Sequence, residues 1–343
     1  MKTVVLGTGS WGTALAQVLC DNNQEAVLWG ISDEEVNDIN QNHRNSRYFD
    51  APVSEKLRAV KDIGEVKDCD VILAAVPTMA LEDVLTEAAK EVTKPVIIIN
   101  VAKGFHPVTH ERLSEVIRKI MPKEKTKAVV SLIGPSHAEE VILRMLTCIN
   151  AVSDDMEAAK TVQQMFSNEY FRVYRNDDVI GAEIGVAVKN VIALASGMLE
   201  GIGQGDNARA ALMTRGLAEM TRFGTALGGR KETYLGLDGV GDLIVTCTSR
   251  HSRNFMAGLK IGQDGGSEKF FAENKKTVEG IFACKVVYDE AKKRGIEMPI
   301  TEQIHAVLYE GKSPAAAAKD LMARELEPET SDVYTKMHKA GTF

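Results

Sequence analysis

Thr3-Val4-Val5-Leu6-Gly7-Thr8-Gly9-Ser10-Trp11-Gly12 is the stretch that decides the fold of this 343-residue chain. Its first four residues form an apolar run typical of a strand, and residues 13–22 place apolar side chains at helical spacing. The glycines between them follow the spacing GxGxxG, which in this setting predicts a dinucleotide-binding turn. Gly7 permits the tight turn, Gly9 lets the backbone approach a pyrophosphate, and Gly12 lets helix and strand pack closely. The free N–H groups and the positive helix end would hold the anion.

The same alternation of strand and helix continues beyond this turn. Strands are predicted at 26–29, 70–76, 95–101 and 128–133, with helices at 79–92 and 109–121, and two short strands near 147–152 and 170–174. This pattern predicts an α/β fold with a doubly wound, mostly parallel Rossmann-type sheet. We expect that sheet to occupy residues 1–178 and to bind the cofactor.

From about residue 178 onward, the strand signal fades. Helical patterns cover residues 182–199, 207–227, 253–261, 279–294, 301–310 and 314–323. We therefore predict an all-α substrate-binding domain at 179–343, packed against the nucleotide domain so that the cleft between the two is the active site.

Cofactor choice depends on the residues just after the second predicted strand. An NAD enzyme usually has Asp or Glu there, to bind the ribose 2′-hydroxyl. Here Gly30-Ile31-Ser32 follows the strand, and Asp33 comes later. No carboxylate repels a 2′-phosphate and no adjacent Arg attracts one, although Arg44 and Arg47 follow in a loop. The sequence therefore allows NADP without excluding NAD.

A lysine in an apolar setting is the strongest catalytic candidate. Lys189 lies in the segment 185–193, which reads as the beginning of a long helix that is apolar on most sides. Burying a lysine is costly unless it is paired or takes part in chemistry. The alternative is a structural lysine whose head reaches water.

Two further groups of residues suggest substrate contacts. Lys103, Gly134 and Ser136 follow predicted parallel strands, where α/β sheets bind ligands. Residues 246–254 place hydroxyls, an amide and two arginines at an apparent helix start, which suits a phosphate. The alternative for this stretch is a capped surface turn. His137, a lone histidine, is more often a satisfied polar residue than a catalyst.

Composition excludes several other classes of protein. The chain has 41 basic and 48 acidic residues, so its net charge of −7 argues against nucleic-acid binding. The five scattered cysteines include no CxxC pair, which predicts no metal site and reduced cytoplasmic thiols. We also expect no signal peptide and no membrane span. The oligomeric state is not determined by the sequence, and a homodimer is compatible with it.

Several longer motifs occur in one order along nearly the whole chain. They are residues 7–12 (GTGSWG), 103–105 (KGF), 134–140 (GPSHAEE), 189–193 (KNVIA), 215–220 (RGLAEM), 241–243 (GDL), 252–254 (SRN) and 278–280 (VEG). In this respect the chain resembles the soluble, NAD(P)-dependent glycerol-3-phosphate dehydrogenases of bacteria. The resemblance implies interconversion of dihydroxyacetone phosphate and sn-glycerol 3-phosphate, which supplies glycerophospholipid synthesis.

The resemblance also implies roles for individual residues. Lys189 would be the proton acceptor. On chemical grounds, we expect Asp242 and Asn190 to fix the Lys189 head and the substrate hydroxyl. Together with Gly7, Gly9 and Gly12 of the turn, the cofactor site would include Ser10, Trp11, Lys103, Ala138, Arg253 and Glu279. The substrate site would comprise Lys103, Gly134, Ser136, Lys189, Asn190, Asp242, Ser252, Arg253 and Asn254. No metal is implied.

The chain departs from the family pattern at three positions. Ile133 stands where Ser is common, and Leu146 stands where Pro is common, so the loop between them is expected to differ in detail. Ile31 replaces a residue that is often basic near the cofactor's 2′ position. Two alternatives stay open: a dehydrogenase of similar plan for hydroxyacyl thioesters or ketopantoate, and a dinucleotide-sensing regulator without turnover.

Overall fold

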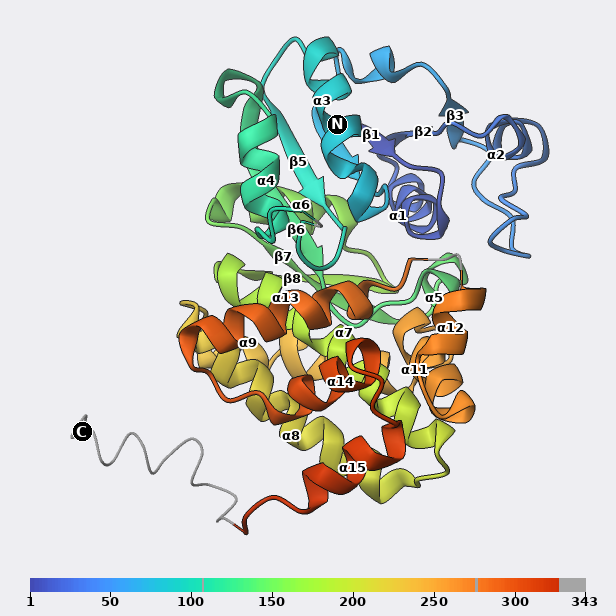
Figure 1. Cartoon of the computed structure of the whole chain (residues 1–343). Helices are drawn as coiled ribbons and strands as arrows, with labels where there is room; N and C mark the ends of the chain where they lie inside the picture. Colours follow the sequence, from blue (N-terminus) through green and yellow to red (C-terminus); the bar gives the residue numbers. More distant parts are fainter. Residues whose placement is uncertain (107, 275–276, 327–343) are drawn as a thin grey trace.

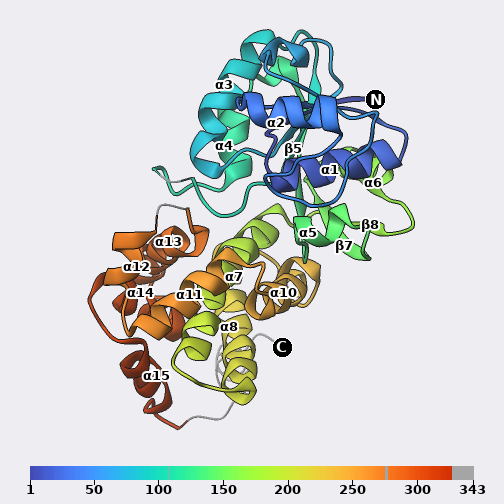
Figure 2. The same ribbon diagram turned by 90° about the vertical axis from the view of Figure 1, so that its right-hand side faces the viewer.

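The computed structural model describes residues 1–106, 108–274 and 277–326. The N-terminal half of the chain forms a sheet with covering helices, and the C-terminal half forms a group of helices (Figure 1). The same two parts are distinct in the view turned by 90° (Figure 2). The arrangement agrees with the α/β architecture predicted from the sequence.

The described residues form an eight-stranded sheet in the order β3-β2-β1-β4-β5-β6-β7-β8. β1 to β6 are mutually parallel, whereas β7 runs antiparallel to β6 and β8 runs parallel to β7. The strand order reverses between β1 and β4, which is where such sheets bind ligands. The strands are β1 (Lys2–Leu6), β2 (Glu25–Trp29), β3 (Arg58–Val60), β4 (Val71–Ala74), β5 (Val96–Asn100), β6 (Thr126–Ile133), β7 (Thr147–Val152) and β8 (Phe171–Asn176).

Helices cover both faces of this sheet. α1 and α6 bury residues such as Leu15 and Phe166 in a core that includes Val5 of β1. α3 and α4 bury Leu85 and Ile117 against the opposite face. The elements around the sheet are α1 (Ser10–Asp21), α2 (Asp33–Asn37), η1 (Asp38–Asn42), η2 (Ile63–Val66), η3 (Thr78–Ala80), α3 (Leu81–Glu91), α4 (Leu113–Ile120), η4 (Lys123–Lys125), α5 (Ala138–Ile142) and α6 (Met156–Phe166).

α7 is the central helix of the second part, with α8, α10, α11 and α13 packed around it. It approaches α11 closely because both helices have glycines at the crossing: a Cβ on Gly197 or Gly258 would lie 2.0 Å from a carbonyl oxygen of the other helix. The elements are α7 (Val179–Gly201), α8 (Asp206–Ala226), α9 (Lys231–Tyr234), η5 (Leu237–Gly241), α10 (Asp242–Thr248), α11 (Arg253–Asp264), α12 (Glu268–Glu273), α13 (Glu279–Arg294), α14 (Pro299–Tyr309) and α15 (Pro314–Met322).

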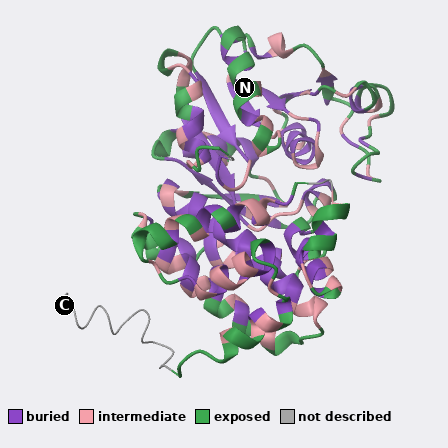
Figure 3. Ribbon diagram, in the orientation of Figure 1, coloured by how far each residue is buried: buried purple, intermediate pink, exposed green. Residues whose placement is uncertain are grey.

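Among the described residues, α7 is the one helix long and apolar enough to cross a membrane by length and composition. However, 89% of its most apolar window is buried inside the protein. Its apolar composition is thus accounted for by its place in the core, and Figure 3 shows how much of the two parts is buried.

Three details of the sequence prediction are wrong. The long helix, predicted over residues 182–199, begins earlier, at Val179, because the Asp178 carboxylate accepts a hydrogen bond from the Gly181 N–H (2.9 Å) and caps it there. Residues 246–254 are not one helix start, since α10 ends and α11 begins within them. β3, α6 and α10 were not predicted. Short segments and amphipathic helices are stabilised largely by packing against the rest of the protein.

Candidate active site

The glycine-rich turn closes tightly toward the sheet and is open on its other side. Gly7 has φ +123°, and a Cβ there would lie 2.8 Å from the carbonyl oxygen of Ala75, just after β4. A Cβ on Gly12 would lie 2.2 Å from the Gly7 oxygen. Over Gly9, by contrast, the described residues place no atom within 4 Å of such a Cβ. The backbone at Gly9 is thus accessible to a pyrophosphate at the start of α1.

A buried carboxylate that was not expected from the sequence lies beside this turn. Glu35 on α2 accepts a hydrogen bond from the Thr8 hydroxyl and pairs with Arg47 (2.8 Å). Arg44, the other arginine of that loop, donates to the Asp50 carbonyl instead. Ile31, two residues after β2 ends at Trp29, is 80% exposed. No simple spacing rule would have identified Glu35, because its contact with Thr8 depends on how α2 folds back.

Lys189 is buried on α7, only 2% exposed, and is therefore not the lysine with a solvated head that was considered as the alternative. Its ammonium pairs with Asp242, and its Nζ donates to the Thr246 hydroxyl oxygen (3.0 Å). Burial lowers the Lys189 pKa to about 8, with Asp242 opposing the shift and the neighbouring Lys103 adding to it. A lysine with this pKa can exchange a proton near neutral pH.

α10 supplies both partners of Lys189. Asp242 and Thr246 are four residues apart and so lie on one face of this helix, and the Thr246 hydroxyl donates to the Asp242 carbonyl (2.6 Å). In the sequence, Thr246 stood out only as part of the stretch 246–254 expected to bind a phosphate. The i, i+4 spacing from Asp242 would have identified it, had the helix been recognised.

A chain of hydrogen bonds links three helices beside Lys189. The Asn190 side-chain oxygen accepts from the Asn254 amide (2.9 Å), whose own oxygen accepts from the Gly280 N–H (2.8 Å). Ser252 caps α11 by accepting from the Phe255 N–H. The helix predicted over residues 253–261 thus begins at Arg253, as expected.

Arg253 extends from the first residue of α11 and is 61% exposed along its side chain. It pairs with Glu279, the first residue of α13. The two residues that were both expected at the cofactor thus contact each other at the rim of the site. The guanidinium remains accessible to an anion that would compete with the Glu279 carboxylate.

The loops after β5 and β6 reach the same region from the sheet. The positive charge of Lys103 lowers the pKa of both Lys189 and His137, although burial is the larger cause in each case. The Ser136 hydroxyl donates to the Gly134 carbonyl (3.1 Å). The ring of His137 packs against the ring of His251, with the ring centroids 5.6 Å apart. His251 directly precedes Ser252 in the chain. The contact joins the strand ends to the helical part.

Several buried side-chain atoms of this region have no hydrogen-bond partner among the residues that the structure describes. They include Nε1 of Trp11, Nε2 of His137 and Oδ2 of Asp242. Buried polar atoms are normally bonded, so unsatisfied ones call for an explanation. Together with the open backbone at Gly9, they fit a site that takes a dinucleotide and a polar substrate. His137 is thus not the satisfied polar residue that the sequence favoured.

Ile133 and Leu146 are two of the three positions that depart from the family pattern. Ile133 is buried in an apolar cluster with Val152 and Val186. Leu146 lines a cavity of about 500 Å³ near Tyr174, at the far edge of the sheet. Neither side chain joins the polar groups described above.

Comparison with known proteins assigns the family. The family model described as "NAD-dependent glycerol-3-phosphate dehydrogenase N-terminus" matches residues 2–159. The model for the C-terminus of the same family matches residues 178–319. A glycerol-3-phosphate dehydrogenase [NAD(P)+] of Streptococcus uberis is 48% identical over 330 residues, which cover 96% of this chain and 98% of that one. The chain belongs to the glycerol-3-phosphate dehydrogenase family.

Two further relatives extend this assignment. A glycerol-3-phosphate dehydrogenase [NAD(P)+] of Bacillus subtilis is 47% identical, over 97% of both chains. The crystal structure of glycerol-3-phosphate dehydrogenase from Coxiella burnetii superposes with a TM-score of 0.87 at 35% identity, covering 94% of this chain and 99% of that one. The family interconverts dihydroxyacetone phosphate and sn-glycerol 3-phosphate with NAD(P), as the sequence resemblance implied.

Proposed function

We propose that this member of the glycerol-3-phosphate dehydrogenase family reduces dihydroxyacetone phosphate to sn-glycerol 3-phosphate with NADH or NADPH, and catalyses the reverse oxidation with NAD+ or NADP+. The observation that carries the proposal is the buried Lys189, paired with Asp242 and Thr246 and facing Lys103 at the strand ends. NAD(P)H supplies the hydride when it is bound.

Lys189 is the proposed catalytic residue. Its ammonium donates a proton to the alkoxide oxygen that develops at C2 during reduction, and its neutral amine takes that proton back during oxidation. Asp242 and Thr246 hold Nζ in place, and the free Oδ2 of Asp242 is available to a substrate hydroxyl. Proton transfer of this kind contributes roughly 10²- to 10⁴-fold.

The remaining residues are proposed to bind and orient the two ligands. Gly7, Gly9, Gly12, Ser10, Trp11 and Ala138 would hold the dinucleotide, with Arg253 and Glu279 at its rim. Gly134, Ser136, Asn190, Ser252, Arg253 and Asn254 would line the substrate, and Arg253 with the α11 N-terminus suits its phosphate. Lys103 would contact both ligands. In this proposal residues 1–178 bind the cofactor and residues 179–343 bind the substrate.

Location and assembly complete the proposal. The five cysteines are free, which supports a reducing cytoplasmic setting in which the product feeds glycerophospholipid synthesis. We propose a homodimer as the assembly, and light scattering at several protein concentrations measures it.

Oxidation of NADH and NADPH in the presence of dihydroxyacetone phosphate tests the proposed function. Turnover with this substrate and none with ketopantoate or a hydroxyacyl thioester supports it. Binding of NADH without turnover of any phosphorylated ketone would instead indicate a dinucleotide sensor.

The pH dependence of the two directions should be opposite. Because the Lys189 pKa is about 8 in the free protein, kcat/KM for oxidation should rise with pH through about 8, as the neutral amine forms. For reduction, kcat/KM should fall over the same interval as the ammonium is lost. Initial rates between pH 6 and 10, at subsaturating substrate, measure both limbs. A change of kcat/KM centred near pH 10.5, the ordinary pKa of lysine, would contradict the assignment of Lys189 as the proton donor and acceptor.

Both NADH and NADPH should serve as cofactor. β2 is followed by the exposed Ile31 rather than by a carboxylate, while the Glu35 carboxylate is engaged by Thr8 and Arg47. A 2′-phosphate on the cofactor is therefore not repelled by a carboxylate directly after the strand. Values of kcat/KM for the two cofactors, measured side by side, check this. A preference above about a thousandfold for either one would contradict this interpretation of the turn.

A further inference from the structure

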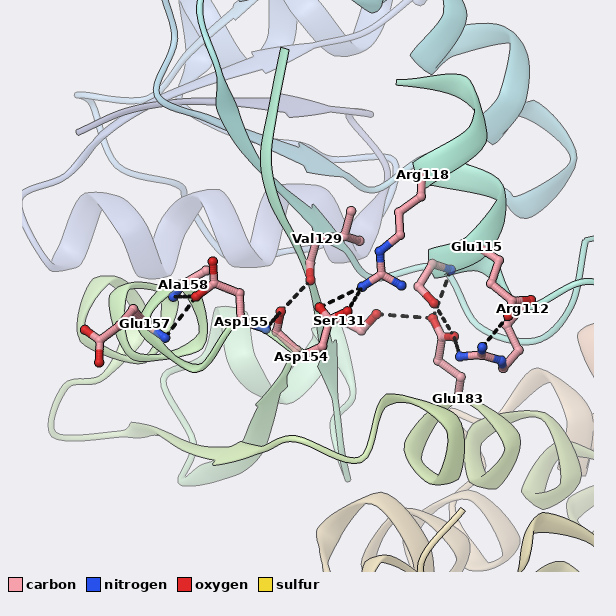
Figure 4. Close-up of polar contacts among 12 residues, drawn as sticks. Arg112, Glu115, Arg118, Val129, Ser131, Asp154, Asp155, Glu157, Ala158 and Glu183 are labelled. Carbon is pink, nitrogen blue, oxygen red and sulfur yellow. Dashed lines mark hydrogen bonds and ion pairs between the residues drawn. The ribbon is translucent and has the colours of Figure 1, made fainter. Parts of the chain in front are cut away.

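Glu183 is a buried carboxylate that takes no part in the proton transfer proposed above. It lies on α7, six residues before Lys189, and is 5% exposed. Its Oε1 accepts from the Ser114 N–H (3.1 Å) and the Ser131 hydroxyl (3.3 Å). Its Oε2 accepts from the Ser114 hydroxyl (2.7 Å) and from Arg112 (3.4 Å). Figure 4 shows Glu183 on its helix directed toward Arg112 and Ser131.

These four hydrogen bonds join the helical part of the molecule to the sheet. Ser114 is in the first turn of α4, whose N–H groups have no partner within that helix, so Glu183 caps α4 from another element. Ser131 is on β6, the strand that leads into Gly134 and Ser136 of the site. The contact therefore connects a substrate-side loop to the helix that carries Lys189.

An apolar contact lies alongside this polar one. Val179, Ala182 and Val186 of α7 pack against Ile133 and Val152 at the ends of β6 and β7. Apolar packing holds the two parts together, but it is non-directional and tolerates small sliding movements. Hydrogen bonds to a carboxylate have a fixed geometry, so the Glu183 contact defines how α7 is oriented on the sheet.

Keeping a carboxylate in this position has a cost. Burial raises the pKa of Glu183 above its usual range, while Ser114, Arg112 and Ser131 act in the opposite direction. A well-packed apolar residue would often be at least as stabilising as such a buried charged group. The carboxylate is thus better explained by the geometry that it imposes than by added stability.

We propose that Glu183 is a positioning residue, whose carboxylate fixes α7 against α4 and β6 and thereby sets the separation between Lys189 and Lys103 across the site. The inference rests on the proposed function, because it concerns the proton transfer by Lys189. Small displacements of a catalytic group can cost about 10²-fold in rate, so the contact matters for turnover rather than for cofactor binding.

The central experiment compares Glu183→Gln with Glu219→Gln as a matched control. Glu219 is another buried carboxylate, 3% exposed, that accepts from the Ile300 and Thr301 N–H groups at the start of a helix. Both of its partners, however, belong to the helical part. In each variant an amide NH₂ replaces one acceptor oxygen, so losses of stability are expected in both. Only Glu183→Gln should lower kcat, by about 10- to 100-fold, with NADH affinity within about twofold of wild type.

The pH profile provides a readout that a purely structural role would not change. Lys189 is faced by Asp242 and Cys247 of α10 and by Lys103 of the sheet part. Asp242 and Cys247 belong to the same helical part as α7. The effect of Lys103 and part of the burial of Lys189, by contrast, depend on how α7 docks on the sheet. Loosening that docking removes two influences that lower the Lys189 pKa. The pH at which kcat/KM for oxidation rises should therefore move upward in Glu183→Gln and stay in place in Glu219→Gln.

Each outcome decides the inference. A normal kcat, or a lower kcat with an unshifted pH limb, overturns it. If Glu183→Gln does not fold, Ser114→Ala and Ser131→Ala each remove one hydroxyl donor, and the same shift in the pH limb is expected at smaller size. Normal behaviour of both serine variants would then overturn it. Absence of turnover in the wild type contradicts the proposed function together with this inference, whereas an active wild type with a normal Glu183→Gln contradicts the inference alone.

Discussion

Replacing Lys189 with methionine should lower kcat by about 10²-fold or more in both directions, because the proton donor of the site is removed. Methionine keeps the unbranched stem and a similar helix propensity, so α7 should persist. NADH affinity should be retained, because the glycine-rich turn that would hold the dinucleotide lies between β1 and α1, in the sheet part of the molecule. Stopped-flow rates, NADH fluorescence titration and thermal unfolding should be measured on the same preparation.

The controls for this variant follow from the structure. Removing the ammonium leaves the Asp242 carboxylate buried without its cation, which can destabilise a protein by about 3–5 kcal/mol. The double variant Lys189→Met/Asp242→Asn removes that uncompensated charge and should recover stability without activity. Lys285→Met makes the same change at an exposed position of α13 and should be fully active. A normal kcat in Lys189→Met would refute its catalytic role.

Replacing Arg253 with alanine should raise KM for dihydroxyacetone phosphate by about 10- to 150-fold. This corresponds to roughly 1.5–3 kcal/mol for a hydrogen bond to a charged group. Arg253 is held at the rim by Glu279, and the accessible guanidinium would transfer to the substrate phosphate. KM is measured at saturating NADH, where a change in cofactor affinity does not enter.

Arg250 is the matched control for the phosphate contact. It lies three residues before Arg253, in the short connection between α10 and α11, is similarly exposed, and pairs with Glu200 rather than with Glu279. Arg250→Ala should leave KM unchanged. An unchanged KM in Arg253→Ala would mean that the phosphate is bound elsewhere, and equal increases in both variants would indicate only a general loss of positive charge.

Features that depend on neighbouring residues could be predicted from the sequence. The GxGxxG turn after residues 3–6 indicated a dinucleotide fold, because glycine spacing and local apolar periodicity reflect contacts within one βα unit. The helix over residues 279–294 agrees with α13 at both ends, since Gly295 in the left-handed conformation stops it locally. Resemblance to the family, rather than periodicity, indicated that Lys189 and Asp242 belong to one site.

Contacts between distant segments were decided only by the tertiary structure. The pairing of Lys189 with Asp242 joins α7 to α10, and a short helix such as α10 has too few residues to show a pattern of its own. Glu35 under the glycine turn and Glu183 against Ser114 are ordinary acidic residues in the sequence. Their environment is set by which elements pack together, and burial, pKa shifts and hydrogen bonds exist only once that packing has removed them from water.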